Sequence, residues 1–114
     1  MAPEEGERPG SVSELEVTAL PDGSGFALRG SLDLATAPKA NDRLGQVWVP
    51  GATVVLDLAR LEFMDSTGLN LIARGLRELG ADGTLVLRGP RGVVRRILSV
   101  SGFEGRPNLR LEEA

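Results

Sequence analysis

The fold of this chain is decided by residues 54–69, which read VVLDLARLEFMDSTGL. The run begins as an apolar strand and ends in a sharp Asp-Ser-Thr-Gly turn that opens a helix. The turn places the hydroxyl of Ser66 at the mouth of that helix, where the first backbone N–H groups point outward at the positive end of the helix dipole. A hydroxyl in this position either caps the helix or carries a phosphate group.

Upstream of this run, the sequence predicts a hairpin followed by a helix. Polar and apolar side chains alternate over residues 14–19 and again over residues 26–32, and the turn chemistry of residues 21–25 separates the two stretches. A helix then follows with Thr36 as its candidate N-cap. Its apolar residues recur at helical spacing as far as Trp48, before a Pro-Gly stop.

Downstream, strands and helices continue to alternate. Apolar residues recur at helical spacing from Leu69 to Leu79, and Gly80 ends that helix. Residues 84–87 predict a strand, residues 90–100 a third helix, and residues 109–111 a short last strand.

The predicted order is therefore β-β-α-β-α-β-α-β. Strands that alternate with helices are joined by crossover connections, which make the central strands parallel and the crossovers right-handed. We expect an α/β fold whose mixed sheet is mostly parallel at its centre, with an antiparallel first hairpin and with helices packed on the sheet.

Composition limits the domain organisation and the classes of function. The 114 residues suit one domain, which we expect over residues 12–114. Residues 1–11 are polar and rich in Pro and Gly, which predicts a disordered leader, not a signal peptide or a membrane span, and hence a cytoplasmic protein. The sequence has no cysteine and no histidine, which excludes disulfides, thiolate metal sites, cysteine nucleophiles and the usual general base.

The charge and the aromatic content of the chain do not favour nucleic-acid binding. The net charge is −3, and Phe and Trp are the chain's only aromatic residue types. The basic residues are all arginine except Lys39. Four of them lie close together in the sequence, and they form either a solvated helix face, which we favour, or a patch for an acidic partner or a phosphate: Arg88, Arg91, Arg95 and Arg96.

Two strand-to-helix turns, at residues 32–36 and 64–68, are the expected place for function, because such turns expose backbone donors above a rigid sheet. Together with their flanking strands they resemble the STAS domain, the family of sulphate-transporter domains and anti-sigma factor antagonists. The resemblance extends from about Val12 to Leu111. It rests on LRGSLD at residues 28–33, on residues 54–58 and above all on MDSTGL at residues 64–69.

The resemblance implies that Ser66 is a phosphorylation site, with Thr67 as the second choice. It also implies partner switching. The unphosphorylated protein binds an anti-sigma factor and frees a sigma factor, the anti-sigma factor acts as a serine kinase that ends the contact, and a serine phosphatase resets it. The nucleotide belongs to the kinase, and we expect no cofactor here, because residues 89–92 lack the lysine and the spacing of a phosphate-binding loop.

Around Ser66, the sequence suggests a partner-binding surface. Asp65 can cap the helix and leave Ser66 free. Gly68 either lets the partner approach closely or makes a tight helix entry. Asn70 stands where the family pattern suggests a small residue such as glycine, and it alters the rim of the site. The predicted partner-binding residues are Asp33, Asp65, Ser66, Thr67, Gly68, Asn70, Leu71 and Arg74, with Leu71 as an exposed apolar contact.

Two acidic residues allow more than one role. Asp33 orients the Ser66 loop, contacts the partner or helps to cap the first helix. Asp57 is expected to bond to backbone N–H groups of the loop that follows its strand. Arg74 and Arg77 lie outside the apolar stripe of their helix, either to meet acidic partner residues or as part of a solvated face.

Other classes of function remain open at this point. One alternative is an enzyme that transfers phosphoryl groups with a Mg²⁺ ion held by Asp33, Asp57 and Asp65. Our expectation is a protein that is not an enzyme and has no metal site. A non-phosphorylated module that docks to a membrane transport complex is a second alternative, and a scaffold subunit of a larger signalling particle is a third. The expected oligomeric state is a monomer or a weak dimer.

Overall fold

The computed structural model describes residues 14–113, and the predicted leader, residues 1–11, lies outside them. Within this range the chain forms β1 (Leu15–Ala19), β2 (Gly25–Leu32), α1 (Ala37–Leu44), β3 (Thr53–Met64), α2 (Ser66–Leu79), β4 (Thr84–Arg88), α3 (Gly92–Val100), the 3-10 turn η3 (Phe103–Gly105) and β5 (Leu109–Glu112). The strands form one sheet in the order β1-β2-β3-β4-β5. Only the β1–β2 pair is antiparallel, which confirms the predicted mixed sheet.

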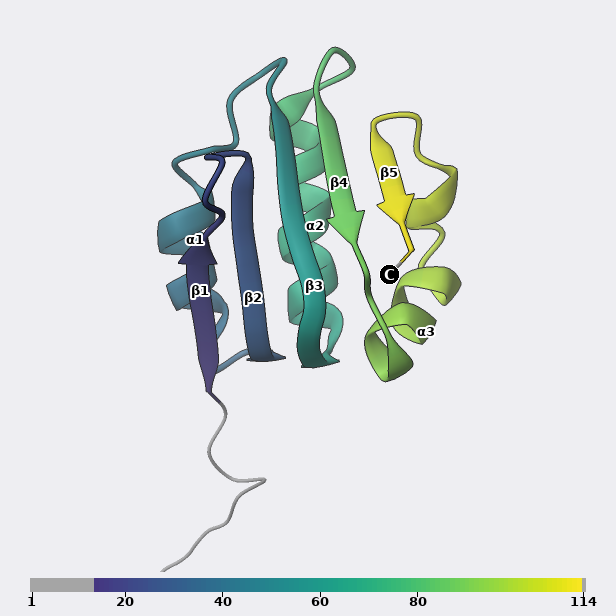
Figure 1. The fold of residues 1–114 in the computed structure, drawn as a ribbon. Helices are drawn as coiled ribbons and strands as arrows, with labels where there is room; N and C mark the ends of the chain where they lie inside the picture. Colours follow the sequence, from purple (N-terminus) through teal and green to yellow (C-terminus); the bar gives the residue numbers. More distant parts are fainter. Residues whose placement is uncertain (1–13, 114) are drawn as a thin grey trace, which may run out of the picture.

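The helices α1 and α2 cover one face of the sheet, and among residues 14–113 no helix lies over the other face (Figure 1). The core lies between these helices and the sheet, where Leu28, Leu58, Leu44 and Ile72 are almost completely buried. Burial of each such side chain contributes roughly 1.5–3 kcal/mol to folding. The opposite face carries exposed charged side chains, among them Glu16, Arg29 and Arg60.

The first helix ends earlier than predicted. α1 stops at Leu44, and the chain turns from Gly45 onward to bring Trp48 back into the core, where it is 5% exposed. The ring lies against Gly75 of α2, at which a Cβ atom would come within 2.6 Å of the indole. The apolar spacing at the end of the predicted helix therefore reflects a buried turn, because a turn can bury the same side chains as another helical turn.

The sequence pattern predicts the third strand over residues 53–58, but β3 is twice that length, and two β-bulges interrupt its pairing with β2. Ala27 pairs with Asp57 but Arg29 with Arg60, and a second extra residue of β3 follows before Phe63. These bulges break the simple alternation after Leu58, which is why the sequence pattern suggested an end there. The extension carries β3 to Met64, at the edge where β2 also ends.

The four neighbouring arginines do not form one patch. Arg88 pairs with Glu112 at 3.2 Å, and Arg95 pairs with Glu104 and Glu113. Hydrogen bonds from Arg88 and Arg110 lower the pKa of Glu112, and those from Ser99 and Arg95 lower the pKa of Glu104. Arg88 and Arg95 thus form ion pairs with the last strand and the end of the described chain. Arg91 instead donates to the carbonyl of Ala59 in β3.

Candidate functional site

The turn between β3 and α2 is built by Asp65. Its backbone is extended, and its Oδ1 accepts a hydrogen bond of 2.9 Å from the backbone N–H of Thr67, so Asp65 is the N-cap of α2 as predicted. Ser66 is the first residue of the helix and is exposed. Within residues 14–113 the Ser66 hydroxyl has no hydrogen-bond partner. The hydroxyl is thus not needed to hold the turn together.

Replacing the cap is expected to weaken the start of α2. Asp65→Ala removes the bond to Thr67, and we expect it to lower the free energy of unfolding by about 1 kcal/mol. Urea denaturation followed by circular dichroism measures the change. Asn70→Ala is the matched control, since Asn70 is exposed on the same helix and caps nothing. Equal stability of the two variants would contradict the capping role.

The turn between β2 and α1 is closed by Asp33 and Thr36. Oδ1 of Asp33 accepts from the backbone N–H groups of Ala35 at 3.0 Å and Thr36 at 3.2 Å. Thr36 occupies the N-cap position, but its hydroxyl makes no cap bond and donates instead to the carbonyl of Ser31 at 2.7 Å. The capping expected of Thr36 is therefore wrong, because the buried threonine hydroxyl is bonded to the end of β2, and Asp33 instead holds the turn that precedes α1.

The two turns lie side by side at one edge of the sheet, where β2 and β3 end beside the first turn of α2 (Figure 1). Leu32 pairs with Met64, and the N–H of Asp65 donates to the carbonyl of Leu32 at 3.3 Å. Gly68 is buried beneath them, and a Cβ atom there would lie 2.5 Å from Cγ of Met64. The suggestion that Gly68 makes room for a partner is wrong, because a side chain there would point into the core, where Met64 and Leu32 already fill the space.

Leu71 also lies differently from the prediction. It is 4% exposed and belongs to the core, so it is no exposed apolar contact for a partner. The buried side of α2 is wider than the predicted stripe, because two glycines let the helix approach the sheet and Trp48 closely. Asn70, Arg74 and Arg77 are exposed as predicted. Arg74 is engaged by Glu78 at 2.7 Å.

The suggested magnesium cluster is not formed. Asp57 accepts from the N–H of Ala59 at 3.0 Å, and Asp33 and Asp65 accept from backbone N–H groups of their own turns. The Asp57 bond confirms the structural role, although it lies within β3 at a bulge and not in a following loop. Among residues 14–113, no three His, Cys, Asp or Glu side chains lie together as a metal site requires.

The STAS domain family model matches residues 14–114. The chain belongs to the STAS domain family. Within residues 14–113, no helix has both the length and the apolar character needed to cross a bilayer.

Individual STAS relatives are distant in sequence. The anti-sigma-F factor antagonist RsfB of Mycobacterium tuberculosis, in strains CDC 1551 / Oshkosh and ATCC 25618 / H37Rv, is 28% identical over 80 residues. The alignment covers 69% of this chain and 66% of the relative, so the chain spans just under two thirds of that relative's length.

Solved STAS structures share the fold over most of the chain. An anti-sigma factor antagonist from Mycobacterium paratuberculosis is 28% identical, with a TM-score of 0.67 over 90% of this chain and 88% of its own. The anti-sigma factor antagonist SpoIIAA in its unphosphorylated form is 25% identical, with a TM-score of 0.61 over 88% of this chain and 87% of its own.

Three exposed apolar side chains near this end of the sheet are not among the predicted partner contacts. Leu34 is 79% exposed in the turn after β2, Phe63 is 42% exposed just before the end of β3, and Val93 is 42% exposed in the first turn of α3. Among residues 14–113 they are three of five exposed large apolar side chains. Leu34 carries the clearest signal, because it interrupts a turn of small and polar residues.

Proposed function

We propose that this chain is an anti-sigma factor antagonist controlled at Ser66. The observation that carries the proposal is the exposed Ser66 hydroxyl, which has no partner within residues 14–113 while Asp65 caps the helix. Unphosphorylated, the protein binds an anti-sigma factor and a sigma factor is released. The anti-sigma factor phosphorylates Ser66 as a kinase and dissociates, and a serine phosphatase restores binding. The names of the similar proteins support the first part of this cycle.

A phosphate at Ser66 is tolerated by the fold itself. It would face the free N–H groups and the positive dipole end of α2, which favours a negative charge by about 0.3–1 kcal/mol at an exposed site. Asp65 opposes this by like-charge repulsion. The two effects oppose each other within the domain, so we expect the main consequence of phosphorylation at the partner, whose surface meets roughly −1.5 to −2 additional charges.

The partner surface combines this polar turn with apolar contacts. Leu34 and Phe63 lie near the ends of β2 and β3, beside the Ser66 turn, at a place that we call the Ser66 edge. Exposed apolar side chains that cluster in this way are typical of protein-protein contacts. Asp33, Asn70 and Arg74 form the polar surroundings in the proposal. Gly68 and Leu71 support the surface from beneath.

Phosphate mapping tests the assignment directly. We expect incubation with ATP and the cognate anti-sigma factor to add one phosphate, which tandem mass spectrometry places on Ser66. Ser66→Ala is expected to abolish the modification, and Thr67→Ala is the matched control that retains it. Phosphate on Thr67, or none from a kinase that binds the protein, would refute the assignment of Ser66.

A further inference from the structure

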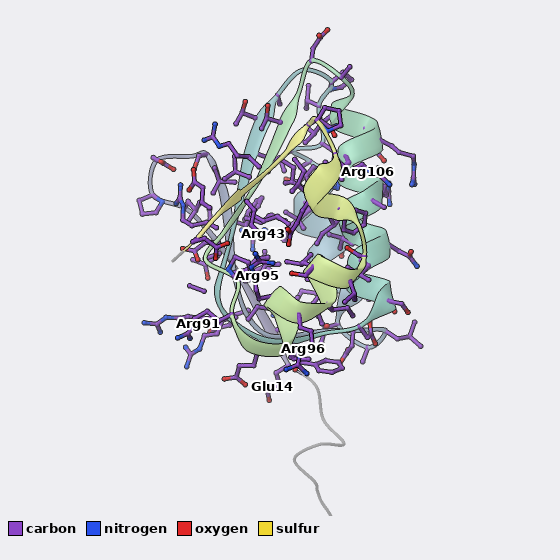
Figure 2. All side chains as sticks on the ribbon, turned by 90° about the vertical axis from the view of Figure 1, so that its right-hand side faces the viewer. Glu14, Arg43, Arg91, Arg95, Arg96 and Arg106 are labelled. Carbon is purple, nitrogen blue, oxygen red and sulfur yellow. The ribbon has the colours of Figure 1, made fainter. Side chains whose placement is uncertain are left out.

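A second charged surface lies on the open face of the sheet. Arg29 of β2, Arg60 of β3 and Arg91 before α3 line one hollow of about 570 Å³, together with Leu61, Glu62 and Val93. Figure 2 shows Arg91 projecting from the lower part of the molecule, on the side of the sheet away from α2. The hollow therefore has three guanidinium groups against one carboxylate.

A β-bulge puts Arg60 into this hollow. Ala27 pairs with Asp57, so a regular strand would place Ala59 beside Arg29 and turn Arg60 to the opposite face. The extra residue instead makes Arg60 the neighbour of Arg29. Asp57 holds the bulge by accepting from the N–H of Ala59, and Arg91 Nε donates to the carbonyl of Ala59 at 3.1 Å. Bulges that redirect a side chain in this way are frequent beside functional sites.

The arrangement does not favour stability. Arg29 and Arg60 are like charges on adjacent strands, which is unfavourable. Glu16 neutralises Arg29 only across 3.4 Å, with both side chains more than 60% exposed, and such pairs contribute little. Within residues 14–113, Arg60 has neither a hydrogen bond nor an ion pair. An exposed, unpaired arginine held beside another arginine is available to an external anion.

We propose that this arginine hollow binds an extended acidic segment of a protein partner. Guanidinium groups pair with carboxylates. Val93, which lines the same hollow, offers an apolar contact for a partner side chain that lies between two carboxylates. A compact phosphate fits less well, because the guanidinium groups are spread along an open surface and Glu62 repels a concentrated charge. The site does not depend on phosphorylation of Ser66, although residues 60–62 lead directly into the Ser66 edge.

The test uses the full chain and defined probes. A blocked hexapeptide with three glutamates alternating with alanines is titrated into ¹⁵N-labelled protein, and backbone and arginine Nε–Hε resonances are followed by NMR. We expect saturable shifts around Arg60 and Arg91. Arg60→Gln is expected to weaken binding about three- to five-fold, the equivalent of one exposed ion pair. Arg77→Gln, which removes an exposed arginine on α2, is expected to leave the dissociation constant within two-fold.

Stability and a second probe complete the test. Because Arg60 supports no contact, Arg60→Gln is expected to melt at the wild-type temperature or slightly above it, so that weaker binding cannot reflect unfolding. The glutamine counterpart of the peptide is expected not to bind. Tighter binding of inorganic pyrophosphate than of the peptide would overturn the proposal in favour of a phosphate ligand. Equal weakening by Arg60→Gln and Arg77→Gln, or absence of shifts at the hollow, would also overturn it.

Discussion

Phosphate on Ser66 is expected to weaken binding of the proposed anti-sigma factor about 100-fold or more, while the fold stays intact. Juxtaposed or desolvated like charge at an interface costs several kcal/mol, and each 1.4 kcal/mol is a factor of ten in affinity. Inside the domain, the same charge lies at the favourable end of α2, so the melting temperature is expected to move by no more than about 5 °C.

Two measurements separate these effects. Isothermal titration calorimetry compares the affinities of the purified phosphorylated and unphosphorylated forms, and circular dichroism compares their thermal unfolding. Gln46→Glu is the control for a negative charge added away from the turn, because Gln46 is exposed after α1, far in sequence from Ser66, and we expect near wild-type affinity for it. A phosphorylated form that binds as tightly as the unmodified protein would reject the switch, and so would a loss of helical structure.

The sequence predicted those features that depend on local chemistry. The alternating strand patterns, the helix boundaries near Asp65 and Gly80, and the cap at Asp65 all follow from residues within one turn of each other. The parallel arrangement followed from the order of strands and helices, because crossovers leave few alternatives.

Features that depend on contacts between distant segments were not predictable in the same way. The bulges of β3 exist only relative to β2, so the sequence of residues 53–64 shows a break in the alternation after Leu58 but not that the strand continues past it. The burial of Leu71 depends on how closely α2 approaches the sheet, and that depth is set by Gly68 and Gly75 against side chains from other elements. The arginine hollow arises from one of these bulges.

A side chain added at residue 68 would make the closest contact of the two glycine positions on α2, which leads to a second prediction with a large effect. Gly68→Val is expected to lower the free energy of unfolding by about 3 kcal/mol, since overpacking a core typically costs 1–3 kcal/mol and occasionally more. A Cβ atom at residue 68 would lie 2.5 Å from Cγ of Met64 and 3.1 Å from Cδ2 of Leu32, both of which are almost fully buried. Urea denaturation measures the loss. Gly105→Ala, at a glycine with open space around it, is the matched control and is expected to change stability little.

A double-mutant cycle distinguishes this clash from a general sensitivity of the helix. Met64→Ala alone is expected to cost about 2–5 kcal/mol through the cavity it leaves. Combined with Gly68→Val, it removes the clashing Cγ while the valine fills the space, so the double variant should be at least about 2 kcal/mol more stable than the sum of the single losses. Simple additivity would show that residue 68 does not pack on Met64. Met64 and Gly68 flank Asp65 and Ser66 in the chain, so the coupling measured by the cycle belongs to the packing directly beneath the Ser66 turn.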